Sequence, residues 1–315
     1  MYYIGVDVGG TGIKAGVVTE NGKIIKSCAI PTQQRSHYTE LIKEMADLIF
    51  KTLQEANLST DDIKSIGIGF PSSVDDKNGV VVYTANINLS NAPVVEELKK
   101  YINKPIFIGN DANCAALGEY FALNDNSIEN FVAVTLGTGV GGGIIINKKL
   151  YTGANGSAGE IGHIRLVMDG EKCSCGRDGC WECYASATAL IRESKRAAEK
   201  NPQSLLAKNI EDNGGRSNGK LVFDTAQKGD ETAKAVIDNY VKYISEGLID
   251  IINIFQPSVI AIGGGISRQG DNLLKPIKEY IKGKSYGASY ITPCEITIAK
   301  LGNDAGIVGA AFLGK

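Results

Sequence analysis

The chain has 315 residues, of which 43% are hydrophobic and 22% are charged, and its formal net charge is −2. This composition is that of a globular enzyme, and the length favours two domains or two similar halves. The balance of charge excludes a broad basic surface, so nucleic acid is not expected as a partner, and the short, interrupted apolar runs exclude a transmembrane helix.

The first expected element is a strand at the N-terminus, where neither the basic region nor the apolar core of a secretion signal is present. A glycine turn follows, with Gly9, Gly10 and Thr11 before Lys14. Backbone N–H groups in such a turn can face an anion, although an ordinary glycine hairpin is the alternative. Asp7, at the end of the strand, could hold a magnesium ion through water.

The next elements alternate between helices and strands. Apolar residues at helical spacing predict a helix over 38–56, and 63–70 read as a strand that ends at Pro71. A helix over 94–101, a buried strand over 105–109 and a helix over 112–121 follow. The alternation predicts an α/β fold.

Asn110 and Asp111 stand where the strand over 105–109 passes into a helix. An Asp at such a place can simply cap the helix. The functional interpretation is that Asn110 binds a hydroxyl group and Asp111 accepts its proton, because phosphoryl transfer to an alcohol needs one positioned carboxylate.

Residues 132–149 repeat the pattern of the N-terminal segment, an apolar run, a Gly/Thr turn, a second apolar run and a polar turn. The repeat predicts two halves that each open with β-hairpins and a phosphate loop. Residues 137–142 also match GxGxxG, but that dinucleotide fingerprint needs a helix directly after the glycines, and 143–148 read as a strand and a turn. A dehydrogenase site is therefore not expected.

The cysteine knuckle, residues 173–180, contains Cys173, Cys175 and Cys180, and His163 lies ten residues upstream of it. Three cysteines and one histidine fill a tetrahedral zinc site without an open position, so we expect a structural metal in the reducing cytoplasm rather than a disulfide framework. Cys183 could replace His163, and unliganded buried cysteines are the alternative. Glu160 and Glu182 flank the knuckle and could bind sugar hydroxyls.

The rest of the chain is predicted as mostly helical. The expected elements are a helix over 185–200, an exposed loop over 209–220, helices over 222–228 and 231–255, a strand over 259–262 and an apolar helix over 305–313. The glycines that follow the strand, 263–265, could let a nucleotide lie against the backbone.

Taken together, these motifs resemble the ROK family (repressors, open reading frames and kinases), and within it the bacterial ATP-dependent glucokinases. The resemblance covers essentially the whole chain. It is most specific where Glu160-Ile161-Gly162-His163 is followed by the CxCGxxGCxE run of residues 173–182.

The resemblance implies an actin- and hexokinase-like (ribonuclease H-like) α/β fold of two duplicated domains with a central cleft for sugar and ATP. A smaller domain would span 1–118, with a helix over 303–315 packed back on it, and a larger one 119–302. Asp111 is implied as the general base that takes the proton from the 6-hydroxyl of the sugar as it attacks the γ-phosphate of Mg-ATP. The family also implies a homodimer.

Further roles are implied position by position. The sugar-binding set is Asn110, Asp111, Glu160, His163 and Glu182, with Ser72 and Asn86 on the substrate side. The nucleotide loops hold Asp7, Gly9, Gly10, Thr11, Lys14, Gly137, Thr138, Gly139, Gly264 and Gly265. The structural zinc would be held by His163, Cys173, Cys175 and Cys180, and His163 would offer its other ring nitrogen to the sugar.

Two departures from the glucokinase pattern lie on the substrate side: Ser72 replaces a glycine, and Leu89 stands where a tryptophan is frequent. An N-acetylmannosamine, allose, fructose or mannose kinase is therefore the alternative within the family. A sugar-sensing repressor is the alternative of another class. It is disfavoured because such repressors carry a helix-turn-helix domain before the first phosphate loop, which here starts at Asp7.

Overall fold

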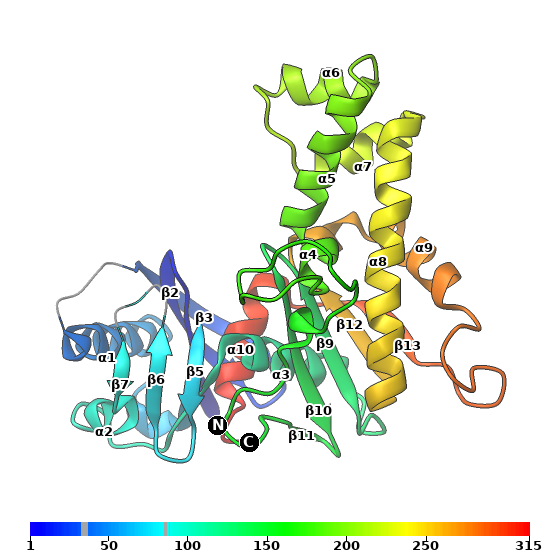
Figure 1. The fold of residues 1–315 in the computed structure, drawn as a ribbon. Coiled ribbons are helices and arrows are strands. Elements are labelled where there is room, and N and C mark those ends of the chain that lie inside the picture. The colour runs from blue at the N-terminus through cyan, green and yellow to red at the C-terminus, as the bar shows by residue number, and fades with distance from the viewer. Residues whose placement is uncertain (33–36, 85–86, 88) are drawn as a thin grey trace. The chain divides into compact units, whose positions relative to one another are not determined.

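The computed structural model describes residues 1–32, 37–84, 87 and 89–315 (Figure 1). By internal contacts the chain forms two compact units: unit 1 is Met1–Glu129, Gly143–Gly159 and Lys300–Lys315, and unit 2 is Asn130–Gly142 and Glu160–Ala299. The predicted domain division between 118 and 119 stays a prediction. Within the described part of the chain, no helix has the length and apolar character needed to cross a membrane.

Unit 1 is built on a sheet of order β3-β2-β1-β4-β8. Its strands are β1 (Tyr2–Val8), β2 (Gly12–Thr19), β3 (Ile24–Pro31), β4 (Ile63–Phe70) and β8 (Ile106–Asn110). β1, β2 and β3 form the predicted antiparallel hairpins, whereas β1, β4 and β8 run parallel. The parallel register places Asp7 beside Gly69, and Gly69 beside Gly109, so the carboxyl ends of these strands meet at one edge.

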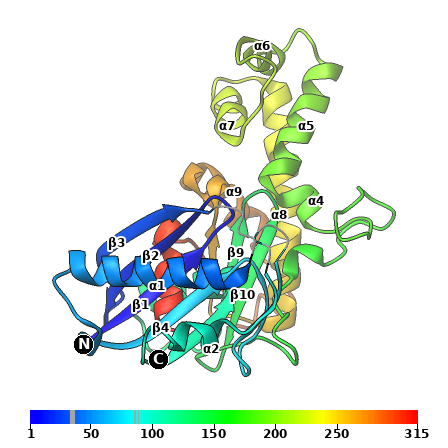
Figure 2. The same cartoon turned by 90° about the vertical axis from the view of Figure 1, so that its left-hand side faces the viewer.

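One face of this sheet carries large aliphatic side chains. Ile4 and Val6 of β1, Ile68 of β4 and Ile108 of β8 are buried in one core with residues of α1 (Tyr38–Glu55). Figure 2 shows α1 lying across this sheet. The helix forms as predicted because its apolar residues recur on one stripe, and burying that stripe supplies most of its stability.

The opposite face carries glycines instead. A Cβ atom on Gly5 would lie 1.8 Å from the carbonyl oxygen of Ile307, and one on Gly67 would lie 1.7 Å from that of Ala310. Both partners belong to α10 (Ala305–Ala311), which also contacts α3 (Asp111–Leu123). The sheet therefore accepts α10 by backbone contact, which only glycine permits.

This close approach predicts that Gly67→Ala strongly destabilises the protein. The added methyl group meets main-chain atoms that cannot rotate away, so we expect a loss of at least about 2 kcal/mol in the free energy of unfolding. Denaturant unfolding measures it. Gly265→Ala is the control, because a Cβ at that position meets no described atom within 4 Å. Equal stability of the two variants would contradict the packing.

A small antiparallel sheet of order β5-β6-β7 completes unit 1. Its strands are β5 (Ser72–Asp75), β6 (Val80–Thr84) and β7 (Ser90–Ala92), and α2 (Val94–Lys99) follows. Buried Glu119 of α3 accepts backbone hydrogen bonds from residues 300, 301 and 302 at 2.6, 2.8 and 3.2 Å. These bonds fix the segment that leads into α10.

The second large sheet has the order β11-β10-β9-β12-β13. Its strands are β9 (Phe131–Leu136), β10 (Val140–Ile146), β11 (Lys149–Leu150), β12 (Val259–Gly263) and β13 (Glu295–Ile298). β12 runs parallel to both β9 and β13. This second sheet, which again opens with a glycine hairpin, confirms the predicted fold class of two related α/β halves.

The helices of unit 2 are α4 (Glu182–Ala185), α5 (Ala187–Lys200), α6 (Leu205–Asp212), α7 (Gly219–Gln227), α8 (Glu231–Phe255) and α9 (Asp271–Ile281). The prediction of an exposed loop over 209–220 is wrong at both ends, because α6 and α7 occupy them. α6 forms because Ser204 caps its first turn and because Leu206 and Ile210 bury one face. The polar composition of the segment concealed those two apolar positions.

Candidate active site and metal centre

Asp7 and Asp111 lie at the carboxyl edge of the parallel strands in unit 1. Asp7 is the next-to-last residue of β1, opposite Lys14 of β2, and Asp111 opens α3 directly after β8. Burial raises the pKa of the Cys114 thiol, and the negative charges of Asp111 and Asp7 raise it further. The two carboxylates therefore flank one buried thiol, at the edge where open α/β sheets bind their ligands.

Burial raises the pKa of Asp7 above its ordinary value, and the charge of Lys14 offsets part of that rise. A carboxyl group whose pKa is higher in the folded state stabilises the fold at low pH, and this contribution is lost as the pH rises through the folded-state pKa. Ionised Asp7 therefore carries a desolvation cost, which a bound cation would offset.

We expect Asp7→Asn to raise the melting temperature of metal-free protein at pH 7, because asparagine carries no charge to desolvate. The difference in melting temperature between variant and wild type should shrink as the pH falls and Asp7 gains a proton. Thermal unfolding in EDTA at a series of pH values from 7 downward measures this difference. A difference in melting temperature that widens at low pH would contradict the assignment.

Asn110, not Asp111, caps α3. Its Oδ1 atom accepts the backbone N–H of Asn113 at 3.1 Å, and its Nδ2 group donates to the carbonyl of Ser72 at 3.3 Å. Asp111 accepts the N–H of Ala112 at 2.8 Å through Oδ1. The capping bonds hold the end of β8 and the start of α3 in one geometry, which orients the Asp111 carboxylate.

The Ser72 hydroxyl is directed into the small sheet. Its Oγ atom lies 2.5 Å from the carbonyl oxygen of Tyr83 and 2.8 Å from that of Ser73. A hydroxyl has one proton, which here is donated to a backbone carbonyl. While this bond persists, Ser72 can accept a hydrogen bond from a sugar but cannot donate one. Leu89 is buried in the core of unit 1. Asn86 lies outside the described residues.

The predicted metal ligands in unit 2 come together. One ligand atom from each of His163, Cys173, Cys175 and Cys180 lies within 4.8 Å of the others. Nδ1 of His163 is 3.5 Å from Sγ of Cys173, and the sulfurs of Cys175 and Cys180 are 3.6 Å apart. A tetrahedral zinc ion would have S···N edges of about 3.5 Å and S···S edges of about 3.8 Å, given its usual bond lengths. The donor set fits zinc and leaves no ligand position open.

Cys183 is not part of this group of four. Its thiol donates to the carbonyl of Lys172 at 3.5 Å, and burial raises its pKa to about 12. The geometry therefore favours His163 as the fourth ligand. Because His163 turns Nδ1 to the cluster, its Nε2 atom is left for another partner.

Glu182 links this cluster to the glycine turn before β10. Its Oε1 atom lies 3.2 Å from Sγ of Cys173 and 3.7 Å from Nδ1 of His163, while Oε2 accepts the N–H of Val140 at 3.4 Å. A Cβ on Gly139 would lie 2.4 Å from Oε2. A side chain at 139 would therefore displace the Glu182 carboxylate from the turn.

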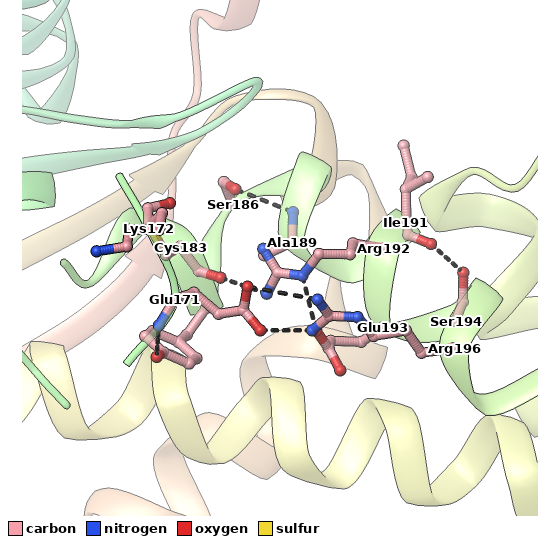
Figure 3. Close-up of polar contacts among 11 residues, drawn as sticks. Glu171, Lys172, Cys183, Ser186, Ala189, Ile191, Arg192, Glu193, Ser194 and Arg196 are labelled. Atoms are coloured by element: carbon pink, nitrogen blue, oxygen red, sulfur yellow. Dashed lines mark hydrogen bonds and ion pairs between the residues drawn. The ribbon is translucent and has the colours of Figure 1, made fainter. Parts of the chain in front are cut away.

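The knuckle and the residues beside it are fixed to the helices of unit 2. The indole of buried Trp181 donates to the carbonyl of Tyr243 on α8 at 2.8 Å, and a Cβ on Gly247 would strike its ring. On α5, Arg192 donates to the carbonyl of Cys183 at 2.7 Å, and Arg196 pairs with Glu171 at 2.5 Å (Figure 3). Neither arginine was predicted from the sequence, where their spacing of four residues on one helix was the available signal.

The third glycine cluster lies beside the second. β12 runs parallel to β9, with Gly263 opposite Thr135. Gly264 has φ +85°, and a Cβ there would lie 2.4 Å from the carbonyl oxygen of Leu136. The turns at 137–139 and 264–265 thus occupy the same edge of one sheet.

The candidate residues fall into two groups. Unit 1 holds Asp7, Gly9, Gly10, Thr11, Lys14, Ser72, Asn110 and Asp111. Unit 2 holds Gly137, Thr138, Gly139, Glu160, His163, Glu182, Gly264, Gly265 and the cysteines of the knuckle. Each half of the repeat therefore presents a glycine turn and a set of polar side chains at the edge of its own sheet.

Comparison with known proteins agrees with this arrangement. The model of the ROK family matches residues 3–315. The chain belongs to the ROK family. A glucokinase from Halalkalibacterium halodurans is 37% identical over 100% of this chain and 95% of its own length. A glucokinase from Streptomyces coelicolor is 38% identical over 99% of this chain and 97% of its own.

A solved structure has the same fold. The crystal structure of a ROK family glucokinase from Streptomyces griseus in complex with glucose and AMPPNP aligns with a TM-score of 0.78. It is 35% identical and covers 99% of each chain. The family prediction and the fold prediction are both confirmed.

Proposed function

We propose that this ROK family protein is an ATP-dependent hexose kinase that transfers the γ-phosphate of ATP to the 6-hydroxyl of glucose. The observation that carries the proposal is the full-length similarity to glucokinases. The positions of Asp111 and of the two glycine turns at sheet edges support it.

In the proposed reaction Asp111 accepts the proton of the 6-hydroxyl while that oxygen attacks the γ-phosphorus. The bond between the γ-phosphorus and the bridging oxygen breaks, and ADP leaves with the electron pair. Asn110 donates to the sugar through its second Nδ2 hydrogen. Glu160, His163 and Glu182 contribute further sugar contacts.

The phosphates of ATP are assigned to the glycine turns, with Thr11 and Lys14 as side-chain donors. Asp7 would hold the magnesium ion through water, in keeping with its half-buried carboxylate. Magnesium would neutralise the charge that develops on the transferring group.

Zinc is proposed for the cluster of three cysteines and His163 as a structural ion. Bound there, it would fix the tautomer and the orientation of the His163 ring, and the knuckle would hold Glu160 and Glu182 in place. We also propose that the protein is a homodimer, which light scattering coupled to size exclusion tests.

A coupled ADP-release assay tests the substrate. The panel is glucose, mannose, fructose, allose, N-acetylglucosamine and N-acetylmannosamine, each with Mg-ATP. We expect kcat/KM to be highest for glucose. A clear preference for N-acetylmannosamine or another hexose would replace glucose as the substrate and leave the kinase class intact, whereas no ADP release with any sugar would contradict the kinase.

A further inference from the structure

The glycine turn between β9 and β10 is held by the first turn of α5. The backbone N–H of Ala187 donates to the carbonyl of Gly137 at 2.8 Å. The hydroxyl of Thr188 donates to the carbonyl of Thr138 at 2.7 Å, 50 positions away in sequence. Two consecutive carbonyl groups of the turn are thereby directed at one helix.

The start of α5 leaves these two donors available. Ser186 caps the helix, and its Oγ atom accepts the N–H of Ala189 at 3.1 Å (Figure 3). The cap thus satisfies the third N–H of the helix and not the first. The N–H of Ala187, which has no partner inside the helix, bonds to the turn instead.

The direction of the carbonyls decides the direction of the neighbouring amides. A trans peptide is planar, and its C=O and N–H groups point in opposite directions; none of the described peptide bonds is cis. The carbonyls of Gly137 and Thr138 belong to the same peptide groups as the amides of Thr138 and Gly139. Because the two carbonyls point toward α5, the N–H groups of Thr138 and Gly139 point away from that helix.

We propose that the Thr188 hydroxyl and the Ala187 amide are positioning groups for ATP, which fix the N–H groups of Thr138 and Gly139 in the orientation that binds phosphate. The proposal rests on the assignment of this turn to the nucleotide. Neither residue touches the phosphates; each acts through a peptide group of the turn. Loss of either bond frees one peptide group to rotate, and one phosphate donor is then no longer preorganised.

Thr188→Val removes the hydroxyl and keeps the shape of the side chain. We expect the affinity for a β,γ-imido analogue of ATP, measured by calorimetry without sugar, to fall about three- to tenfold, as the loss of one neutral hydrogen bond gives. KM for ATP should rise with it, while KM for the sugar stays unchanged. Adenosine, which has no phosphate, should bind equally to variant and wild type. Thr188→Ser should restore the affinity.

Thr232→Val is the matched control, because Thr232 is the second residue of α8 as Thr188 is of α5. It should leave the affinity for the ATP analogue unchanged. Melting temperatures within a few degrees of wild type would show that each variant is folded.

Ala187→Pro tests the second bond. Proline lacks the N–H, and the first position of a helix accepts it. The preceding residue, Ser186, has φ −79° and ψ 164°, a conformation that a following proline allows. We expect the same loss of ATP-analogue affinity without loss of fold.

Wild-type affinity for the ATP analogue in both Thr188→Val and Ala187→Pro would overturn the proposal, as would an equal loss of adenosine affinity. The binding assay is independent of the sugar reaction. If the wild type binds the ATP analogue but phosphorylates no sugar, the proposed kinase function fails while the positioning role is still measured. If the wild type binds no nucleotide, the assignment of the turn to phosphate fails and the positioning proposal fails with it.

Discussion

Asp111→Asn is expected to lower kcat by about 10²- to 10⁴-fold, because asparagine cannot accept the proton of the 6-hydroxyl. The variant keeps the size of the side chain, and Asn110 still caps α3. The dissociation constant for glucose should therefore change little. Steady-state kinetics and calorimetry with glucose measure the two effects separately.

Asp271→Asn is the control, since Asp271 is likewise the first residue of a helix, α9, but it pairs with Lys275 at 3.0 Å on the surface. It should keep nearly wild-type kcat. An Asp111→Asn variant with nearly wild-type kcat would contradict the assignment of Asp111 as the general base. A loss of glucose affinity as large as the loss of kcat would instead make Asp111 a binding residue.

Purified protein is expected to contain about one zinc ion per chain, and Cys180→Ala is expected to lose it. Without the ion no bonds hold the four ligands together, so Glu182 and His163 lose their orientation. We expect KM for the sugar to rise at least about tenfold and the melting temperature to fall, by analogy with the loss of other outer supports of a site. Elemental analysis, kinetics and thermal unfolding measure these three quantities.

Cys183→Ser is the matched control, because that thiol donates to the carbonyl of Lys172 and Cys183 is not one of the four residues whose ligand atoms cluster. It should retain zinc. Burial and the neighbouring thiols raise the pKa of Cys180 to about 12 in the metal-free site, so zinc must displace a proton and should bind more weakly as the pH falls. Fully active protein without metal, or loss of zinc in Cys183→Ser, would contradict the ligand set.

Much of the fold could be predicted because local patterns decide it. The hairpins on either side of the glycine turns and the long helix α8 follow from apolar spacing and turn residues alone. The cluster of His163 with the cysteines could be predicted too, since the cysteines of the knuckle are close in sequence and their side chains have few other roles at that spacing. The sequence left His163 and Cys183 as alternatives, and the grouping of the ligand atoms favours His163.

What could not be predicted depends on contacts between distant parts of the chain. The need for glycine at 67 comes from α10, more than two hundred residues later in the sequence. The hydroxyl of Ser72 could not be assigned, because its partner is the carbonyl of Tyr83 across a hairpin. The contact between Thr188 and Thr138 is of the same kind: both residues are ordinary in sequence, and only the packing of α5 against the turn connects them.

Phosphorus NMR of the protein mixed with glucose and Mg-ATP tests the central claim most directly, because it identifies both the product and the position of the new phosphate. The account predicts that ATP is consumed while glucose 6-phosphate and ADP appear in equal amounts. Intact ATP, ADP with free phosphate only, or a phosphate on another carbon of glucose would contradict it.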